Sequence, residues 1–142
     1  MRWMAGSFAC LTLAATVLGC ASLQPPPPPG IVVAVTDVKS LSGKWVGTLI
    51  DRRNMGTPAQ IIIDPDGTYA ANFGITSARG TVAVQPDGQL AFTMTSGSGV
   101  LGVTDSASTA TLYDRDGKRV LVGNGRVGFY QTPFSWEVMQ QK

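Results

Sequence analysis

Apolar and polar residues alternate with a period of two through most of residues 38–142, the pattern of strands that bury one face. Residues 90–94 show it most clearly, because Leu90, Phe92 and Met94 are separated by Ala91 and Thr93. No stretch of ten to twelve residues has a convincing helical period. The pattern predicts eight short strands, at residues 43–50, 59–64, 68–73, 80–85, 89–95, 108–114, 119–123 and 134–139.

Three of the joints between these segments contain Asp-Gly: "DPDG" (64–67), "QPDG" (85–88) and "DRDGK" (114–118). Glycine supplies the positive φ that a tight hairpin needs. Tight turns in this order predict an all-β fold in which the strands follow one another antiparallel, up and down. Eight such strands can close into a barrel, which removes exposed edges. A sandwich of two sheets is the alternative that the pattern leaves open.

The first 37 residues have a different composition. Arg2 precedes an apolar run of about eleven residues, which is too short to span a bilayer and is typical of a removable export signal, expected at 1–19. Residues 20–37 contain five consecutive prolines, which favour a stiff polyproline II spacer. A proline-rich ligand for another protein is the alternative. The folded domain is therefore expected at 38–142.

"VLGC" (17–20) ends the apolar run and resembles the lipobox of bacterial lipoproteins. The resemblance implies cleavage before Cys20 and attachment of fatty chains, such as palmitate, to that residue. Several chains give stable membrane anchoring. Ala21 at the next position resembles the sorting signal of outer-membrane lipoproteins. The expected location is therefore the outer membrane, lipid-anchored and facing the periplasm; a plain signal peptide with an incidental cysteine is the alternative.

The charge and cysteine content narrow the possible functions. The chain has eleven Lys and Arg against nine Asp and Glu, and removal of the signal would take away one cation, Arg2. This balance gives no reason to expect binding to nucleic acid. Of the two cysteines, Cys10 would be removed with the signal and Cys20 lipidated, so we expect no disulfide and no thiolate metal site.

The side chains that usually carry catalysis are scarce. The chain has no histidine, which is the commonest general base. Its only glutamate, Glu137, alternates outward from Trp136 and Val138, and the aspartates cluster in turns. We therefore expect a protein that is not an enzyme and that has no cofactor, no catalytic residue and no metal site.

"Gly43-Lys44-Trp45" at the start of the first predicted strand resembles the G-x-W signature of lipocalins and related barrels. The resemblance implies an eight-stranded barrel with Trp45 plugging its closed end, and it makes Gly43 and Trp45 structural residues. It also implies an arginine partner for the tryptophan on the last strand. That strand has none; Arg126, just before it, could substitute.

Three longer connections, at 51–58, 96–108 and 123–133, each follow an odd-numbered predicted strand, so all three should meet at one rim of a barrel. Loops are the usual home of binding residues. The candidate binding rim comprises Arg52, Arg53, Arg126, Phe129 and Tyr130. We expect a membrane-anchored interaction module that contacts another envelope protein through this rim. The lipocalin resemblance implies the alternative, a carrier of a small apolar ligand; long loops that are merely tolerated also remain possible.

Overall fold

The computed structural model describes residues 30–98, 107–127 and 131–142. The predicted export signal, Cys20 and the proline tract lie outside the described residues, as do Phe129 and Tyr130. In the described part, one short 3-10 helix and nine strands follow one another along the chain. These are β1 (Ile31–Val32), η1 (Val38–Leu41), β2 (Gly43–Ile50), β3 (Gly56–Ile63), β4 (Thr68–Phe73), β5 (Thr76–Val84), β6 (Leu90–Ser98), β7 (Ala107–Arg115), β8 (Lys118–Val127) and β9 (Thr132–Gln140).

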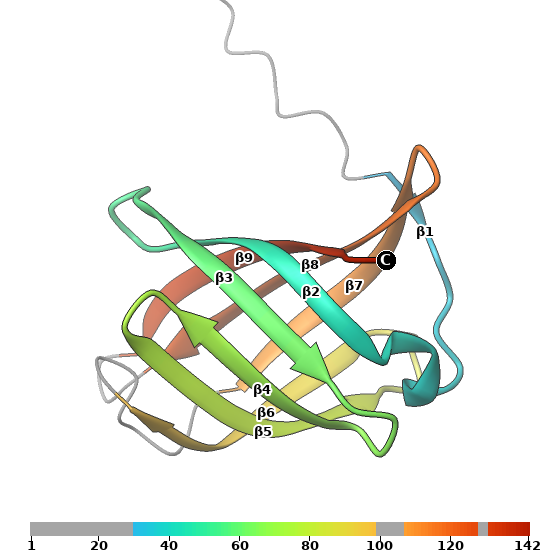
Figure 1. Ribbon diagram of the computed structural model, residues 1–142, viewed down its shortest axis with the longest axis horizontal. Coiled ribbons are helices and arrows are strands. Elements are labelled where there is room, and N and C mark those ends of the chain that lie inside the picture. Colours follow the sequence, from blue (N-terminus) through green and yellow to red (C-terminus); the bar gives the residue numbers. More distant parts are fainter. Residues whose placement is uncertain (1–29, 99–106, 128–130) are drawn as a thin grey trace, which may run out of the picture.

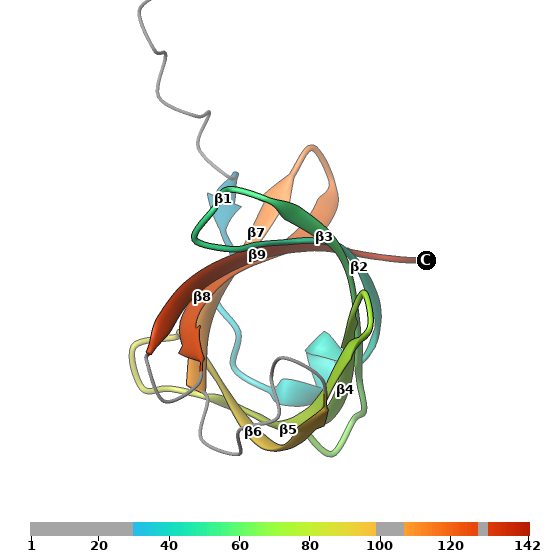
Figure 2. The ribbon, with the colours of Figure 1, turned by 90° about the vertical axis from the view of Figure 1, so that its left-hand side faces the viewer.

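The strands β2 to β9 form a closed antiparallel barrel (Figures 1 and 2). Each strand pairs with the next one along the chain, and β9 returns to pair with β2, where Trp45 lies opposite Gln140 and Ile50 opposite Ser135. This closure confirms the all-β, eight-stranded up-and-down barrel. The two-sheet sandwich is not formed, because closure leaves neither β2 nor β9 with a free edge.

The ninth strand, β1, lies outside the barrel order and pairs with the end of β7, Ile31 opposite Asp114 and Val32 opposite Tyr113. It takes the edge of β7 that β6 leaves open, because β6 pairs with β7 only as far as Ala110. Val35, which follows β1, is buried in the core at 4% exposure. The folded part thus begins before Val38, because Ile31 and Val32 pair with the edge of β7 and Val35 packs into the core.

The two ends of the barrel differ in how they are closed. We call the end that carries η1 and the turns β3–β4, β5–β6 and β7–β8 the closed end. The predicted Asp-Gly turns lie there, with Gly67, Gly88 and Gly117 at φ of 87°, 83° and 76°. We call the opposite end the mouth; the β2–β3 loop, the end of β6, the start of β7, the end of β8, the start of β9 and a two-residue β4–β5 turn of Gly74 and Ile75 lie there.

Trp45 and η1 plug the closed end. The indole is fully buried and its Nε1 donates to the carbonyl oxygen of Leu41, 2.9 Å away. The guanidinium of Arg119, on β8, lies 5.7 Å from the ring centroid and donates 2.6 Å to Ser40 O and 3.0 Å to Gln140 Oε1. A cation over an indole face is attracted by the ring quadrupole. The tryptophan therefore has an arginine partner, and it is Arg119 on β8, not Arg126.

Arg126 cannot reach Trp45 because the two residues lie at opposite ends of the barrel. Arg126 pairs with Ala107 and Pro133 near the mouth. The segment around it was expected to be a connector, yet β8 continues through Val127. Gly123 permits this, because a Cβ there would overlap the indole of Trp136, its partner on β9. Because glycine has no Cβ, the indole of Trp136 can lie directly against the backbone of β8.

Candidate functional site

A cavity of about 530 Å³ opens at the mouth, within the range of small-molecule sites. Polar groups from the loop and strand ends surround apolar side chains that lie deeper in the barrel. Arg52 and Arg53 of the predicted rim both line it. Among the described residues, the lining consists of Leu49, Asp51, Arg52, Arg53, Thr57, Phe73, Thr76, Val127, Thr132 and Phe134.

The β2–β3 loop that carries the two arginines is held by Asp51. Its Oδ1 accepts from the backbone N–H groups of Arg53 and Met55, at 2.8 and 3.0 Å. The loop closes with Asp51 N donating to Met55 O at 3.2 Å, and Asn54 takes a left-handed φ of 59°. An aspartate that bonds its own following amides is a common way to fix a tight loop. The backbone that carries Arg52 and Arg53 is therefore fixed by local hydrogen bonds.

The side chains of both arginines are exposed, and no hydrogen bond or ion pair is formed by either within the described part of the chain. The described ion pair elsewhere, Arg115 Nη1 to Glu137 Oε1 at 2.7 Å, lies on the outer wall. The hydrogen bonds that the Arg115 guanidinium donates to Glu137 raise the pKa of Arg115. Glu137 faces outward as its alternation predicts, and it is engaged in this surface pair.

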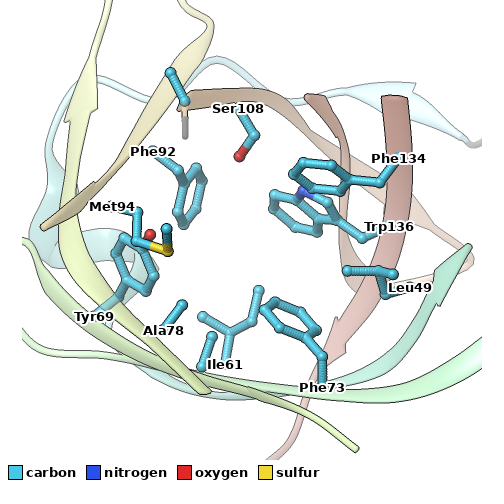
Figure 3. Close-up of a pocket in the computed structure, with 12 residues that line it drawn as sticks. Leu49, Ile61, Tyr69, Phe73, Ala78, Phe92, Met94, Ser108, Phe134 and Trp136 are labelled. Atoms are coloured by element: carbon cyan, nitrogen blue, oxygen red, sulfur yellow. The ribbon is translucent and has the colours of Figure 1, made fainter. Parts of the chain in front are cut away.

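A second, smaller cavity of about 50 Å³ lies deeper in the barrel (Figure 3). Leu49, Phe73 and Phe134 line both cavities, and we call these three side chains the throat. The inner cavity can hold only a few non-hydrogen atoms, since a single water needs about 10–15 Å³ measured in this way. Among the described residues, the barrel therefore has its larger cavity at the mouth and is packed below.

Aromatic rings form much of the wall of the inner cavity. Tyr69 and Trp136 each meet Phe92 edge to face, with ring centroids 5.4 and 5.2 Å apart. Such contacts fix the rings relative to one another. The side chains of Tyr69 and Ser108 point into the cavity in Figure 3. Burial raises the pKa of Tyr69 to about 12, so its hydroxyl stays protonated at neutral pH.

Charge is distributed unevenly between the two ends of the described barrel. The mouth half carries four arginines and a single described carboxylate: Arg52, Arg53, Arg79 and Arg126 against Asp51. The closed end carries six aspartates and six cations: Asp37, Asp64, Asp66, Asp87, Asp114 and Asp116 against Lys39, Lys44, Arg115, Lys118, Arg119 and Lys142. Glu137, on the outer wall, forms its ion pair with Arg115 of this set. The described mouth is therefore positive, whereas the described closed end carries nearly as many cations as carboxylates.

The structure brings together only part of the predicted rim. Arg126 is exposed on the outer side of the mouth, where its Nη1 lies 3.5 Å from Gln131 O. It lines a separate outer groove of about 320 Å³ and does not line the mouth cavity. Gly43 begins β2, and Trp45 lies at the closed end, away from the mouth.

Sequence reasoning did not anticipate the throat. Phe73 ends the predicted strand 68–73 and Phe134 begins the predicted strand 134–139, but nothing local distinguishes a residue near the mouth from one in the middle of the core. Thr76 was also missed; it is 7% exposed, lines the mouth cavity and begins β5. Its neighbourhood, "GITSAR", resembles a connection, and β5 extends into it because β4 provides a paired edge.

Two further observations concern metal and membrane. Among residues 30–98, 107–127 and 131–142, no group of three or more acidic, cysteine or histidine side chains gathers to hold a metal ion. The same residues include no helix long and apolar enough to cross a bilayer.

Comparison with known proteins identifies no family for the chain. No family model, curated protein or solved structure matches it.

Proposed function

We propose that this protein is a lipid-anchored, non-enzymatic binding protein of the bacterial envelope, with a lipocalin-like barrel that takes its ligand at the mouth. The observation that carries the proposal is the mouth cavity of about 530 Å³, in which two arginines with no ion pair among the described residues lie above an apolar throat. A few polar groups placed over an apolar floor are typical of ligand sites.

The chemistry of the lining supports binding in preference to catalysis. The titratable groups of the described cavity wall are Asp51, Arg52 and Arg53. Oδ1 of Asp51 accepts hydrogen bonds from two backbone amides, and arginine does not give up its proton near neutral pH. General acid–base catalysis needs a group that can donate or accept a proton during the reaction.

The position of the N-terminal segment supports a tethered arrangement. Gly30 packs against the backbone of Asp114, beside the β7–β8 turn at the closed end, and β1 continues from there (Figure 1). A lipid anchor at Cys20 would therefore attach to the end opposite the mouth. In this arrangement the mouth faces away from the membrane, open to molecules of the periplasm.

A carrier of a long apolar ligand is the weaker candidate. The inner cavity of about 50 Å³ leaves no room for a long chain below the throat. Tyr69, Phe92 and Trp136 occupy the space that such a ligand would need. A ligand is therefore expected to sit at the mouth with at most a small group below it.

The test is to locate binding on the intact chain. Isotopically labelled protein in phosphatidylcholine nanodiscs would be mixed with an envelope extract, and backbone amide shifts would be followed by nuclear magnetic resonance. We expect shifts at Thr57, Thr76 and Thr132, and none at the exposed closed-end residues Lys39 and Lys44. Shifts confined to the closed end, or none with any fraction, would contradict the proposal. Incorporation of labelled palmitate, and its loss in Cys20→Ser, tests the anchor separately.

A further inference from the structure

We infer that the mouth cavity selects a small amphiphile with an anionic head, a carboxylate or a phosphate, and a short apolar part. The inference rests on the proposed function and names the ligand class of the same site. Arg52 and Arg53 would hold the head, and the throat of Leu49, Phe73 and Phe134 would hold the apolar part.

The preference for an anion follows from the charges at the mouth. Arg52 and Arg53 carry two positive charges into the cavity wall, and neither is neutralised by a described ion pair. Asp51 brings the opposing charge, but its Oδ1 already accepts from two amides of the loop. The lining therefore keeps an excess of positive charge. Arg79 and Arg126 in the same half of the barrel add to a field that attracts anions.

The residue type and its backbone point to an oxyanion. A guanidinium presents several N–H donors in a planar fork, which matches the paired oxygens of a carboxylate or phosphate. The loop that carries both arginines is fixed by the hydrogen bonds of Asp51, so little backbone ordering is left for the ligand to induce. The threonines of the lining, Thr57, Thr76 and Thr132, add hydroxyl donors around the head.

The apolar part is limited in length by the packing below. Leu49, Phe73 and Phe134 line both the mouth and the inner cavity, so an apolar group held at the mouth would rest on them. The inner cavity of about 50 Å³ accepts only the end of such a group. Affinity should rise about three- to fourfold for each methylene that the throat covers and stop rising once the inner cavity is full.

Calorimetric titration of the intact chain in phosphatidylcholine nanodiscs, with empty nanodiscs as the blank, tests the inference. The probes are hexyl phosphate and hexanoate as anionic amphiphiles, 1-hexanol as the neutral analogue, and inorganic phosphate as the head alone. We expect one site at which the better anionic amphiphile binds at least tenfold more tightly than 1-hexanol or inorganic phosphate. The ratio of hexyl phosphate to hexanoate affinity distinguishes a phosphate ligand from a carboxylate ligand.

Variants assign the head to the arginines. The double variant Arg52→Gln/Arg53→Gln should weaken the anionic amphiphiles at least tenfold and leave 1-hexanol within twofold. The matched control Lys39→Gln/Lys44→Gln removes two exposed cations from the closed end and should change neither. A circular dichroism melt of each variant verifies that the fold is kept.

The outcomes separate this inference from the proposed function. Equal affinity for 1-hexanol and hexyl phosphate, or unchanged anion binding in the Arg52/Arg53 double variant, overturns the ligand class and leaves binding at the mouth in place. If none of the four probes binds, the ligand class is overturned as well. If, in addition, no envelope fraction shifts the amides of the mouth, the proposed function fails with it.

Discussion

The same antiparallel strands run through both ends of this barrel, yet the side chains at one end fill it and those at the other surround a cavity. At the closed end, Trp45 is fully buried, Arg119 lies over its ring, and the hydrogen bonds of that arginine join β8, β9 and η1. At the mouth, the apolar side chains of the throat are partly exposed, and Arg52 and Arg53 have no described partner. Arginine is therefore structural at the closed end, whereas Arg52 and Arg53 at the mouth are left without a described partner.

This difference predicts that residues at the closed end contribute to stability and that residues at the mouth contribute to binding. Groups that are buried and fully hydrogen-bonded contribute to folding, whereas unpaired groups around a cavity keep their interactions for a ligand. Substitutions at the closed end should therefore lower the free energy of unfolding. Those at the mouth should change binding and leave stability almost intact.

The largest effect is expected from Trp45→Ala. The change empties the plug of the closed end and removes the hydrogen bond from Nε1 to Leu41 O. Loss of a buried tryptophan costs about 3–5 kcal/mol. Guanidinium chloride unfolding measures the loss, and a cost below about 1 kcal/mol would mean that the closed end is not the stability centre.

The next effect is expected from Gly123→Ala. The added Cβ would overlap the indole of Trp136, so β8 and β9 must shift apart or the ring must turn. Overpacking of this kind costs about 1–3 kcal/mol. Asn124→Ala, at the neighbouring exposed position of the same strand, is the control and should be close to neutral. Equal midpoints for the two variants in thermal melts would contradict the packing seen here.

Two matched substitutions on β8 compare the ends directly. Arg119→Met keeps the unbranched stem of the side chain but removes the bonds to Ser40 and Gln140 and the cation over Trp45, at a cost of about 1–2 kcal/mol. Arg126→Met removes an exposed arginine near the mouth and should change stability by less than about 0.5 kcal/mol. Equal losses in urea titrations would remove the distinction between the ends.

Alkaline pH should destabilise the barrel through Tyr69. Burial raises its pKa from the usual 10 to about 12 in the folded state. The unfolded chain therefore loses this proton first, so the contribution of Tyr69 is fully present below pH 10 and declines between pH 10 and 12. Tyr69→Phe should flatten the stability profile over this range. An unaltered profile in the variant would assign the alkaline loss to other groups.

The smallest effect on stability is expected for the double variant Arg52→Gln/Arg53→Gln. Both side chains are exposed and unpaired, so the free energy of unfolding should change by less than about 0.5 kcal/mol. Differential scanning calorimetry measures this in the ligand-free protein. A loss comparable to that of Arg119→Met would show that the mouth arginines stabilise the fold and would weaken their assignment to a ligand.

Local patterns predicted much of this fold because strand faces and tight turns are local. The alternation of Leu90, Phe92 and Met94 places all three in the core. The turns at Gly67 and Gly88 each close with the glycine N–H donating to the residue three positions earlier, at 3.0 and 2.9 Å. A positive φ and a period of two can both be recognised within a few residues.

The remaining features depended on contacts between distant segments. "GNGRV" has the composition of a loop, but it is a strand because β7 and β9 flank it and Trp136 fills the space at Gly123. Arg119 and Arg126 are seven positions apart on one strand, and only the barrel decides which one meets Trp45. For the candidate site, the sequence indicated the rim with Arg52 and Arg53 but not the throat.

The sequence by itself determined the order of the eight barrel strands and the three Asp-Gly turns, because each depends on the alternation and the backbone preferences of neighbouring residues. The tertiary structure decided that β9 closes on β2, that Trp45 and Arg119 seal one end, and that a cavity lies above Phe73 and Phe134 at the other. Those outcomes depend on how side chains from distant strands pack against one another in the barrel interior. A pattern of neighbouring residues carries no information about that packing.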